Sequence, residues 1–337
     1  MRDDSSCCRS KYCNMYYIIP VVMLIILLLY ILVIASVDEL IQYVIFKERH
    51  NRIPIEYTSL DGKNDYTAIY HHNVVPHASL QCVEYAFNNN DNVILFIHGS
   101  SGSIRERMYI RDICKHLNIN LFLYDYRGYG YSSGIPDHSN ICSDSVLVYD
   151  YIKKKYSSVI VWGESLGGCV ACYLSSKRSI DNIVIQSTFS SMRDVVGYYS
   201  SKFTILRMLT CLYDCKMLDT LSYIRNSVNK KCNVIVAHSE EDELLPYYMC
   251  EDICREYRSL SSNIIKVRMY GSHSAPRMRA GEIYNMVSFL FYMIGRQSSH
   301  EEINNVSSNI YKVMTSISVT GNDLDNSSDN IDGRSIY

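Results

Sequence analysis

Short apolar runs separated by polar turns fill the middle of the chain. The runs at 92–99, 119–128 and 158–163 have the length and composition of buried strands. The longer segment at 139–155 carries apolar residues at helical spacing, and the pattern ends with a helix at 282–294. Strands that alternate with helices in this way predict an α/β fold, with a mostly parallel central sheet and helices on both faces.

The alternation has a beginning, an interruption and an end. Residues 53–62 predict a strand and turn that open a domain extending over 53–295. Residues 188–231 interrupt the alternation and carry an amphipathic stretch, which predicts a short cap over the sheet. The tail at 296–337 is rich in Ser, Asn and Asp, and this composition predicts disorder.

An uncharged apolar run occupies residues 16–37, after a short N-terminal tail at 1–15. About 20 apolar residues suffice to cross the hydrocarbon core of a bilayer as a helix. The run is longer than the apolar part of a cleaved signal peptide, so we expect one transmembrane anchor rather than a signal peptide. Residues 38–52 would then form a juxtamembrane connector.

The charges beside the apolar run bear on its orientation. The cations before the run lie closer to it than those after it, which favours a cytosolic N-terminus and a lumenal or external main domain. The side of the membrane stays open on this argument. Cys7, Cys8 and Cys13 then lie beside the membrane, either as S-acylation sites or as ordinary free thiols.

Composition limits the classes of partner. The chain has 337 residues, 47% of them hydrophobic, and a net charge of −2. It therefore lacks the broad basic field that a nucleic-acid backbone requires, and no nucleic-acid partner is expected. Its 13 cysteines are odd in number, and no Cys-x-x-Cys pair has a partner pair or a His-x-x-x-His, so we expect no metal site. We also expect no cofactor.

The stretch "VWGESLGG" contains Gly-x-Ser-x-Gly between a predicted strand and a predicted helix. This is the context of a nucleophile elbow, in which Ser165 is exposed on a sharp turn and Gly163 and Gly167 leave it room. The N–H of Leu166 would be one donor to an oxyanion. Taken alone, the same pattern also fits a glycine-rich turn that only packs closely.

A second loop follows the strand at 92–97. Its sequence is "HGSSGS", and Ser100, directly after His98-Gly99, is the candidate for the second oxyanion donor. Two aligned donors lower a transition state by several kcal/mol, on the order of 3–4 per donor. His98 itself is expected to shape the loop rather than to act as a base.

An acid and a base follow in the order that a Ser-Asp-His triad on this fold requires. Asp242 lies in "AHSEEDELLP" after a late strand, and His273 lies in "GSHS" after the last strand. His273 would take the proton of Ser165, and Asp242 would hold the other ring nitrogen. The neighbouring acids of the loop, Glu240, Glu241 and Glu243, are expected to be solvated. Two other histidines, His238 and His300, fit the role of base less well.

Together these motifs resemble a known family. "FIHGSSGSIRERM", "LYDYRGYGYSSGIP", "VWGESLGG", "QSTFSSMRDV", "AHSEEDELLP" and "GSHS" occur in the order found in membrane-anchored α/β-hydrolase-domain serine hydrolases. The resemblance covers residues 53–294 and implies an α/β-hydrolase fold. Members of the group are monoacylglycerol and lysophospholipid lipases or acyl-protein thioesterases that remove palmitate. The resemblance therefore implies an acyl lipid or an S-acylated protein as substrate.

Carried over position by position, the resemblance assigns Ser165 as nucleophile, Asp242 as acid and His273 as base. The chain departs from the family pattern where Ser100, Ser239 and Ser274 replace Asn, Gly and Asn, respectively. None of these changes removes a triad group. The expected function is thus a membrane-anchored serine hydrolase of acyl esters or thioesters. The alternative from another class is a catalytically silent hydrolase fold used for binding.

Overall fold

The computed structural model describes residues 67–71, 74–75, 78–201, 217–260 and 262–325, and scattered residues between 19 and 46. The chain divides into two compact units, residues 1–47 and 48–337.

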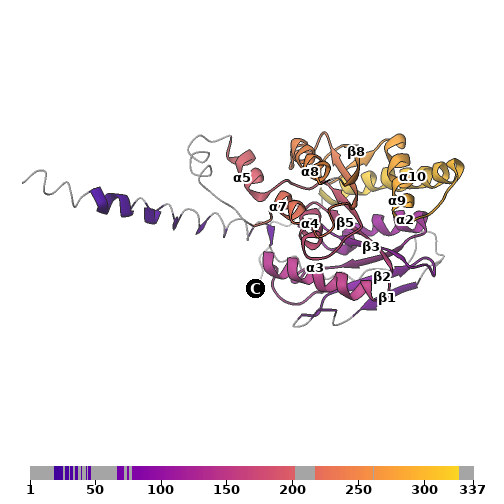
Figure 1. Cartoon of the computed structure of the whole chain (residues 1–337), viewed down its shortest axis with the longest axis horizontal. Coiled ribbons are helices and arrows are strands. Elements are labelled where there is room, and N and C mark those ends of the chain that lie inside the picture. Colours follow the sequence, from indigo (N-terminus) through magenta and orange to yellow (C-terminus); the bar gives the residue numbers. More distant parts are fainter. Residues whose placement is uncertain are drawn as a thin grey trace, which may run out of the picture. The chain divides into compact units, whose positions relative to one another are not determined.

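In the first unit, the described residues from Ile19 to Ile45 are helical (Figure 1). The large apolar side chains that are described from Ile19 to Leu32 are exposed. The predicted anchor at 16–37 lies only partly within the described residues. None of the helices that the structure describes has both the length and the apolar character needed to cross a bilayer. The predicted tail at 1–15, with its three cysteines, and most of the connector at 38–52 lie outside the described residues.

The second unit is built around a sheet of nine described strands in the order β1-β2-β4-β3-β5-β6-β7-β8-β9. Strands β4, β3, β5, β6, β7 and β8 run parallel, while β1, β2 and β9 pair antiparallel at the two edges. The predicted, mostly parallel sheet is confirmed. The predicted strand at 53–62 lies outside the described residues. The strands are β1 (Thr67–His71), β2 (Cys82–Ala86), β3 (Asn92–Ile97), β4 (Asn120–Tyr124), β5 (Ser158–Glu164), β6 (Asn182–Gln186), β7 (Asn233–Ser239), β8 (Asn263–Tyr270) and β9 (Arg277–Met278).

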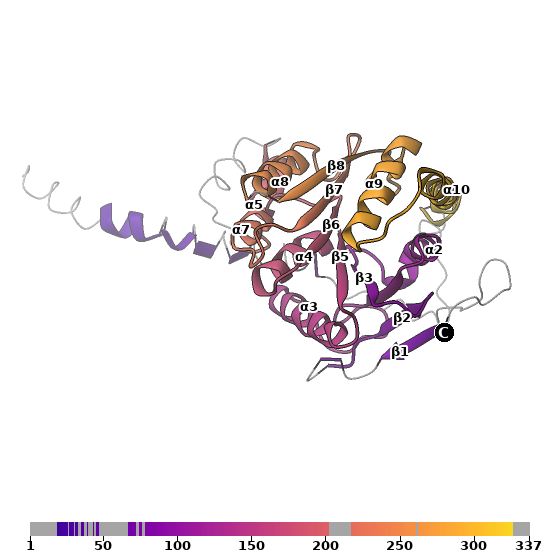
Figure 2. The same cartoon turned by 45° about the vertical axis from the view of Figure 1, so that its right-hand side comes forward.

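Helices cover both faces of the sheet, as predicted (Figure 2). Helices α2, α9 and α10 gather on one face, and α3, α4, α7 and α8 on the other. Because side chains alternate along a strand, each parallel strand contributes to two apolar layers. Phe96 and Trp162 belong to the layer beneath α2 and α9, and both are buried. The helices are η1 (Ile104–Arg107), α2 (Met108–Leu117), α3 (His138–Lys153), α4 (Leu166–Lys177), α5 (Met192–Ser200), α7 (Thr220–Arg225), α8 (Tyr248–Ser259), α9 (Ala280–Met293) and α10 (His300–Asp325).

The C-terminal segment departs from the sequence-based expectation. Disorder was expected over 296–337, whereas 300–325 form α10, which packs on α2 and α9. Ile303, Ile310 and Met314 are buried in the same apolar layer as those helices. These three residues have helical spacing and form a narrow apolar stripe. Ser and Asn lie between them and dominate the composition of the segment, so the apolar periodicity is weak. The prediction is therefore wrong for 300–325; residues 326–337 lie outside the described chain.

The predicted cap at 188–231 is described in two parts. Helix α5 forms the first part and α7 the second, while 202–216 lie outside the described residues. Helix α7 packs on α4, where the rings of Tyr173 and Tyr223 meet edge to face at 5.3 Å. The second described part of the insertion therefore covers the helix that follows β5.

Candidate active site

Ser165 lies in a sharp turn between β5 and α4. Its backbone has φ 53° and ψ −119°, a conformation that side chains other than glycine rarely adopt. The chain packs tightly around it: a Cβ on Gly167 would lie 2.0 Å from the carbonyl oxygen of Ile97, and one on Gly163 would lie 2.2 Å from that of Gly167. Only glycine fits at these two positions. The sharp turn at Ser165 therefore depends on glycine at both positions.

His273 connects Ser165 to Asp242. Its loop follows β8 and turns at Gly271, which has φ 87°. The Nε2 atom of His273 lies 3.1 Å from Ser165 Oγ, and its Nδ1 lies 2.7 Å from Asp242 Oδ2. The Asp242 side chain is fully buried, whereas His273 is 15% exposed. The structure thus brings together, in a single hydrogen-bonded chain, the three residues that the sequence singled out.

The second oxygen of Asp242 is also fixed. Oδ1 accepts hydrogen bonds from the N–H groups of Leu244 at 3.0 Å and Leu245 at 2.7 Å. Burial alone would raise the pKa of Asp242, but the hydrogen bond and charge of His273 outweigh it and hold this pKa below its ordinary value. Asp242 is therefore an oriented carboxylate at neutral pH.

His238 lies beside the same carboxylate but away from the serine. Its Nε2 donates to the carbonyl oxygen of Leu245 at 2.9 Å and lies 3.4 Å from Asp242 Oδ2. Burial lowers the pKa of His238, so the ring is neutral at physiological pH. The structure accordingly places His238 as a support for the acid loop and not as a second base.

Two neighbouring acids contact the loop of His273, contrary to the expectation that they are only solvated. Glu243 accepts a hydrogen bond from the backbone N–H of His273 at 2.9 Å, and Glu241 accepts one from Gly271 N–H at 2.8 Å. Glu240 does face solvent, 3.8 Å from Arg268. The sequence shows a run of four consecutive acids, but it does not show which of them contact the loop after β8.

The two expected oxyanion donors lie on neighbouring loops. Ser100 follows β3 and Leu166 follows β5, and these two strands pair in parallel. Gly99 allows the loops to approach, because a Cβ there would lie only 3.2 Å from Ser165 Cβ. Within the described part of the chain, neither the Ser100 nor the Leu166 N–H has a hydrogen-bond acceptor. Both amides are therefore available to a ligand atom.

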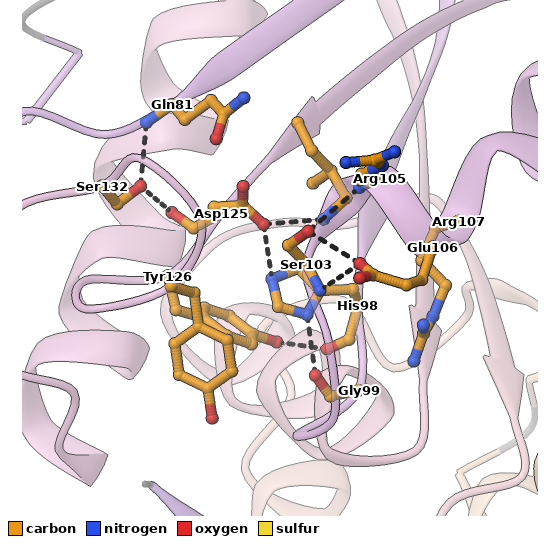
Figure 3. A network of polar contacts seen from close by, with 12 residues as sticks. Gln81, His98, Gly99, Ser103, Arg105, Glu106, Arg107, Asp125, Tyr126 and Ser132 are labelled. Carbon is orange, nitrogen blue, oxygen red and sulfur yellow. Dashed lines mark hydrogen bonds and ion pairs between the residues drawn. The ribbon is translucent and has the colours of Figure 1, made fainter. Parts of the chain in front are cut away.

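A buried polar network supports the loop of Ser100 (Figure 3). The Nδ1–H of His98 donates to the carbonyl oxygen of Gly99 at 2.7 Å, and its Nε2 lies 3.4 Å from Asp125 Oδ1. The same carboxyl oxygen accepts from Ile104 N–H at 2.7 Å. Burial lowers the pKa of His98 to about 3 and raises that of Asp125 to about 7. A neutral His98 therefore shapes the loop, as expected, and lies in the core rather than over Ser165.

No cluster of metal-binding side chains forms among the described residues. All eight described cysteines are buried free thiols. Ser165, His273 and Asp242 present the groups needed for nucleophilic and acid–base chemistry.

Comparison with known proteins agrees with the architecture. Residues 92–204 match the family model of the alpha/beta hydrolase fold. The chain is 26% identical over 208 residues to a lysophosphatidylserine lipase of Danio rerio, which covers 56% of this chain and 54% of that protein. It is 25% identical over 205 residues to an uncharacterised membrane protein of Saccharomyces cerevisiae, covering 59% and 70%. The chain spans about half the length of the curated lipases that it matches.

Solved structures agree with this assignment at the level of the fold. An esterase of Pyrococcus furiosus superposes with a TM-score of 0.56 at 17% identity, covering 73% of this chain and 96% of that one.

Proposed function

Because this chain has the α/β-hydrolase fold, we propose that it is a membrane-anchored serine hydrolase that cleaves acyl esters or thioesters. The hydrogen-bonded chain from Ser165 through His273 to Asp242 is the observation that carries this proposal. It supplies a nucleophile, a base and an orienting acid in one geometry.

The reaction proceeds in two halves. In the first, His273 Nε2 takes the Ser165 hydroxyl proton while Oγ attacks the acyl carbonyl, and the Ser100 and Leu166 N–H groups bind the oxyanion. His273 then gives its proton to the leaving alcohol or thiol, which leaves an acyl-serine. In the second half His273 activates a water molecule that releases the acid. Asp242 keeps the proton on Nδ1 throughout, so that Nε2 can accept.

The proposed substrate is an acyl lipid or an S-acylated protein. The lipase named among the relatives supports a lipid substrate, and the yeast relative is named as a membrane protein. The apolar run at 16–37 would anchor the chain beside such substrates, with the hydrolase domain on the lumenal or external side. S-acylation of Cys7, Cys8 and Cys13 would reinforce that anchor. The insertion at 188–231 would line the acyl pocket.

Labelling with a fluorophosphonate probe tests the proposal. The probe reacts only with an activated serine, because the phosphonate captures Oγ after its proton has moved to the base. The wild-type chain is expected to be labelled, and Ser165→Ala is expected to lose the label. Equal labelling of both chains, or labelling of neither, contradicts the proposal. Such a result favours the alternative, a catalytically silent hydrolase fold used for binding. Comparing monoacylglycerol with a palmitoylated peptide then separates ester from thioester hydrolysis.

Replacing Glu243 with alanine tests the support of His273. The change removes the acceptor for the His273 N–H, so the loop loses one hydrogen bond to a charged group. Because the site is partly solvated, we expect kcat/KM to fall only about threefold to tenfold. Hydrolysis of p-nitrophenyl butyrate measures this effect. Glu240→Ala is the matched control, and an equal loss in that variant would remove the role assigned to Glu243.

A further inference from the structure

The two amides assigned to the oxyanion belong to different segments of the chain. Ser100 lies on the loop after β3, and Leu166 begins the helix after β5. An oxyanion needs both donors at about 2.7–3.1 Å at once, so the spacing between the two segments matters for catalysis. Parallel pairing fixes the strands up to Ile97 and Gly163, but not the loops that follow them.

Arg107, at the end of η1, contacts both of these segments. Its Nε donates to Glu164 Oε2 at 2.7 Å, and its Nη2 donates to the carbonyl oxygen of Ser101 at 3.1 Å. Glu164 directly precedes Ser165, and Ser101 directly follows Ser100. A single guanidinium group therefore links the immediate neighbour of the nucleophile to the immediate neighbour of one oxyanion donor.

The ion pair of Arg107 and Glu164 is largely buried. The Arg107 and Glu164 side chains are only 12% and 16% exposed, so water screens them less than a surface pair. The hydroxyl of Tyr109 donates to the same Glu164 oxygen at 3.3 Å. Burial would lower the pKa of Arg107, but the Glu164 charge outweighs it, so the guanidinium remains charged.

We propose that Arg107 and Glu164 are positioning residues that set the distance between the Ser100 and Leu166 amides. This inference rests on the proposed hydrolase function. The planar guanidinium presents Nε and Nη2 in fixed directions. Nε binds the segment of Leu166 through Glu164, and Nη2 binds the segment of Ser100 through Ser101. A lysine ammonium is a single point charge and cannot hold the same two partners in a fixed plane.

A role in binding an anionic group of the substrate is the competing interpretation of Arg107. Two of its nitrogens already donate within the protein, and Glu164 balances its charge. Both observations favour positioning. The two roles differ in kinetics, since a substrate contact changes KM whereas a change in the oxyanion geometry changes kcat.

The experiment compares Arg107→Gln, Arg107→Lys and Glu164→Gln with Arg111→Gln. Arg111 is the matched control, because it is an 8% exposed arginine of α2 paired with Asp112 at 2.8 Å. For each variant, kcat and KM are measured with p-nitrophenyl butyrate, and affinity is measured for a trifluoromethyl ketone. That inhibitor forms a serine adduct whose oxyanion occupies the two donors. Thermal unfolding reports whether each variant folds.

Both Arg107 variants are expected to lose about 10- to 100-fold in kcat and a similar factor in ketone affinity, with KM within about twofold. Glu164→Gln keeps an acceptor but not the charge, so a smaller loss of about threefold to tenfold is expected. This variant also serves as the test if the Arg107 variants do not fold. Arg111→Gln is expected to keep kcat within about twofold.

Three results would overturn the inference: an unchanged kcat, a change confined to KM, or an equal loss in Arg111→Gln. Labelling of wild-type Ser165 by a fluorophosphonate separates this failure from a failure of the proposed function. If the wild type is labelled and the Arg107 variants turn over normally, only the positioning role falls. If the wild type is not labelled, the hydrolase proposal falls, and the positioning role falls with it.

Discussion

An alanine in place of His273 is expected to lower kcat by about 10⁴- to 10⁶-fold, the range found when a triad base is removed. Among the described residues, His273 is the side chain within hydrogen-bond distance of Ser165 Oγ, and in the proposed mechanism its Nε2 accepts the proton. Without it the serine hydroxyl would have to lose its proton to water. His238 cannot replace it, because its Nε2 donates to Leu245 and the ring lies behind Asp242.

Hydrolysis of p-nitrophenyl butyrate under single-turnover conditions measures this loss separately from substrate binding. His300→Ala is the control, because His300 contacts Tyr284 at the start of α10, on a helix that packs against α2 and α9. A His273→Ala chain that retained more than about one per cent of the wild-type rate would show that another group acts as base.

Replacing Asp242 with asparagine is expected to lower kcat by about 10⁴-fold with little change in shape. Leu244 and Leu245 N–H groups both donate to Oδ1, so an amide at this position would keep its oxygen there. Its NH₂ group would then face His273 Nδ1 and donate to it. The proton of the imidazole would move to Nε2, which could no longer accept the Ser165 proton. The same kinetic assay measures this effect, and a loss of less than about tenfold would contradict it.

The same substitution has a signature in stability. Because the pKa of Asp242 is held below its ordinary value, ionised Asp242 stabilises the fold above the unfolded pKa of about 3.9. This contribution disappears as pH falls through the lower folded-state value. The difference in free energy of unfolding between wild type and Asp242→Asn is therefore expected to be constant near neutral pH and to shrink below about pH 4. Urea unfolding at several pH values measures it, and a difference that grew on acidification would contradict the assigned pKa direction.

Features with a local pattern could be predicted from the sequence. The alternation of apolar runs gave the parallel strands, because a strand buried on both faces has few polar positions. The position of Ser165 between strand and helix followed from its two flanking glycines. The order of Asp242 and His273 along the chain placed them at the carboxyl ends of β7 and β8, and parallel strands bring such ends to one edge of a sheet.

Features that depend on distant partners escaped prediction. Strand β2 contains Glu84, which is 1% exposed and accepts from the Tyr156 hydroxyl at 2.5 Å. In a short apolar run, a charged residue without a nearby partner argues against a buried strand. The partner of Glu84 lies 72 positions away in the sequence, so the local pattern does not reveal it. The link between Arg107 and Glu164 spans 57 positions and leaves no periodic trace. Helix α10 escaped for another reason, since its apolar stripe is narrow and its surface composition resembles that of disordered chains.

The backbone of Ser165 has a further consequence for how the chain can change over time. A residue other than glycine in this conformation costs on the order of 1–3 kcal/mol, a sizeable part of the net stability of a domain. Three neighbouring contacts hold it there: its N–H donates to Gln186, and its carbonyl oxygen accepts from Gly168 N–H and Thr188 Oγ1. A chain that used this fold only for binding would gain stability by relaxing the turn with glycine at position 165. Glycine at position 165 is therefore expected to stabilise the fold by about 1–3 kcal/mol, while it removes the hydroxyl on which the proposed hydrolase function depends.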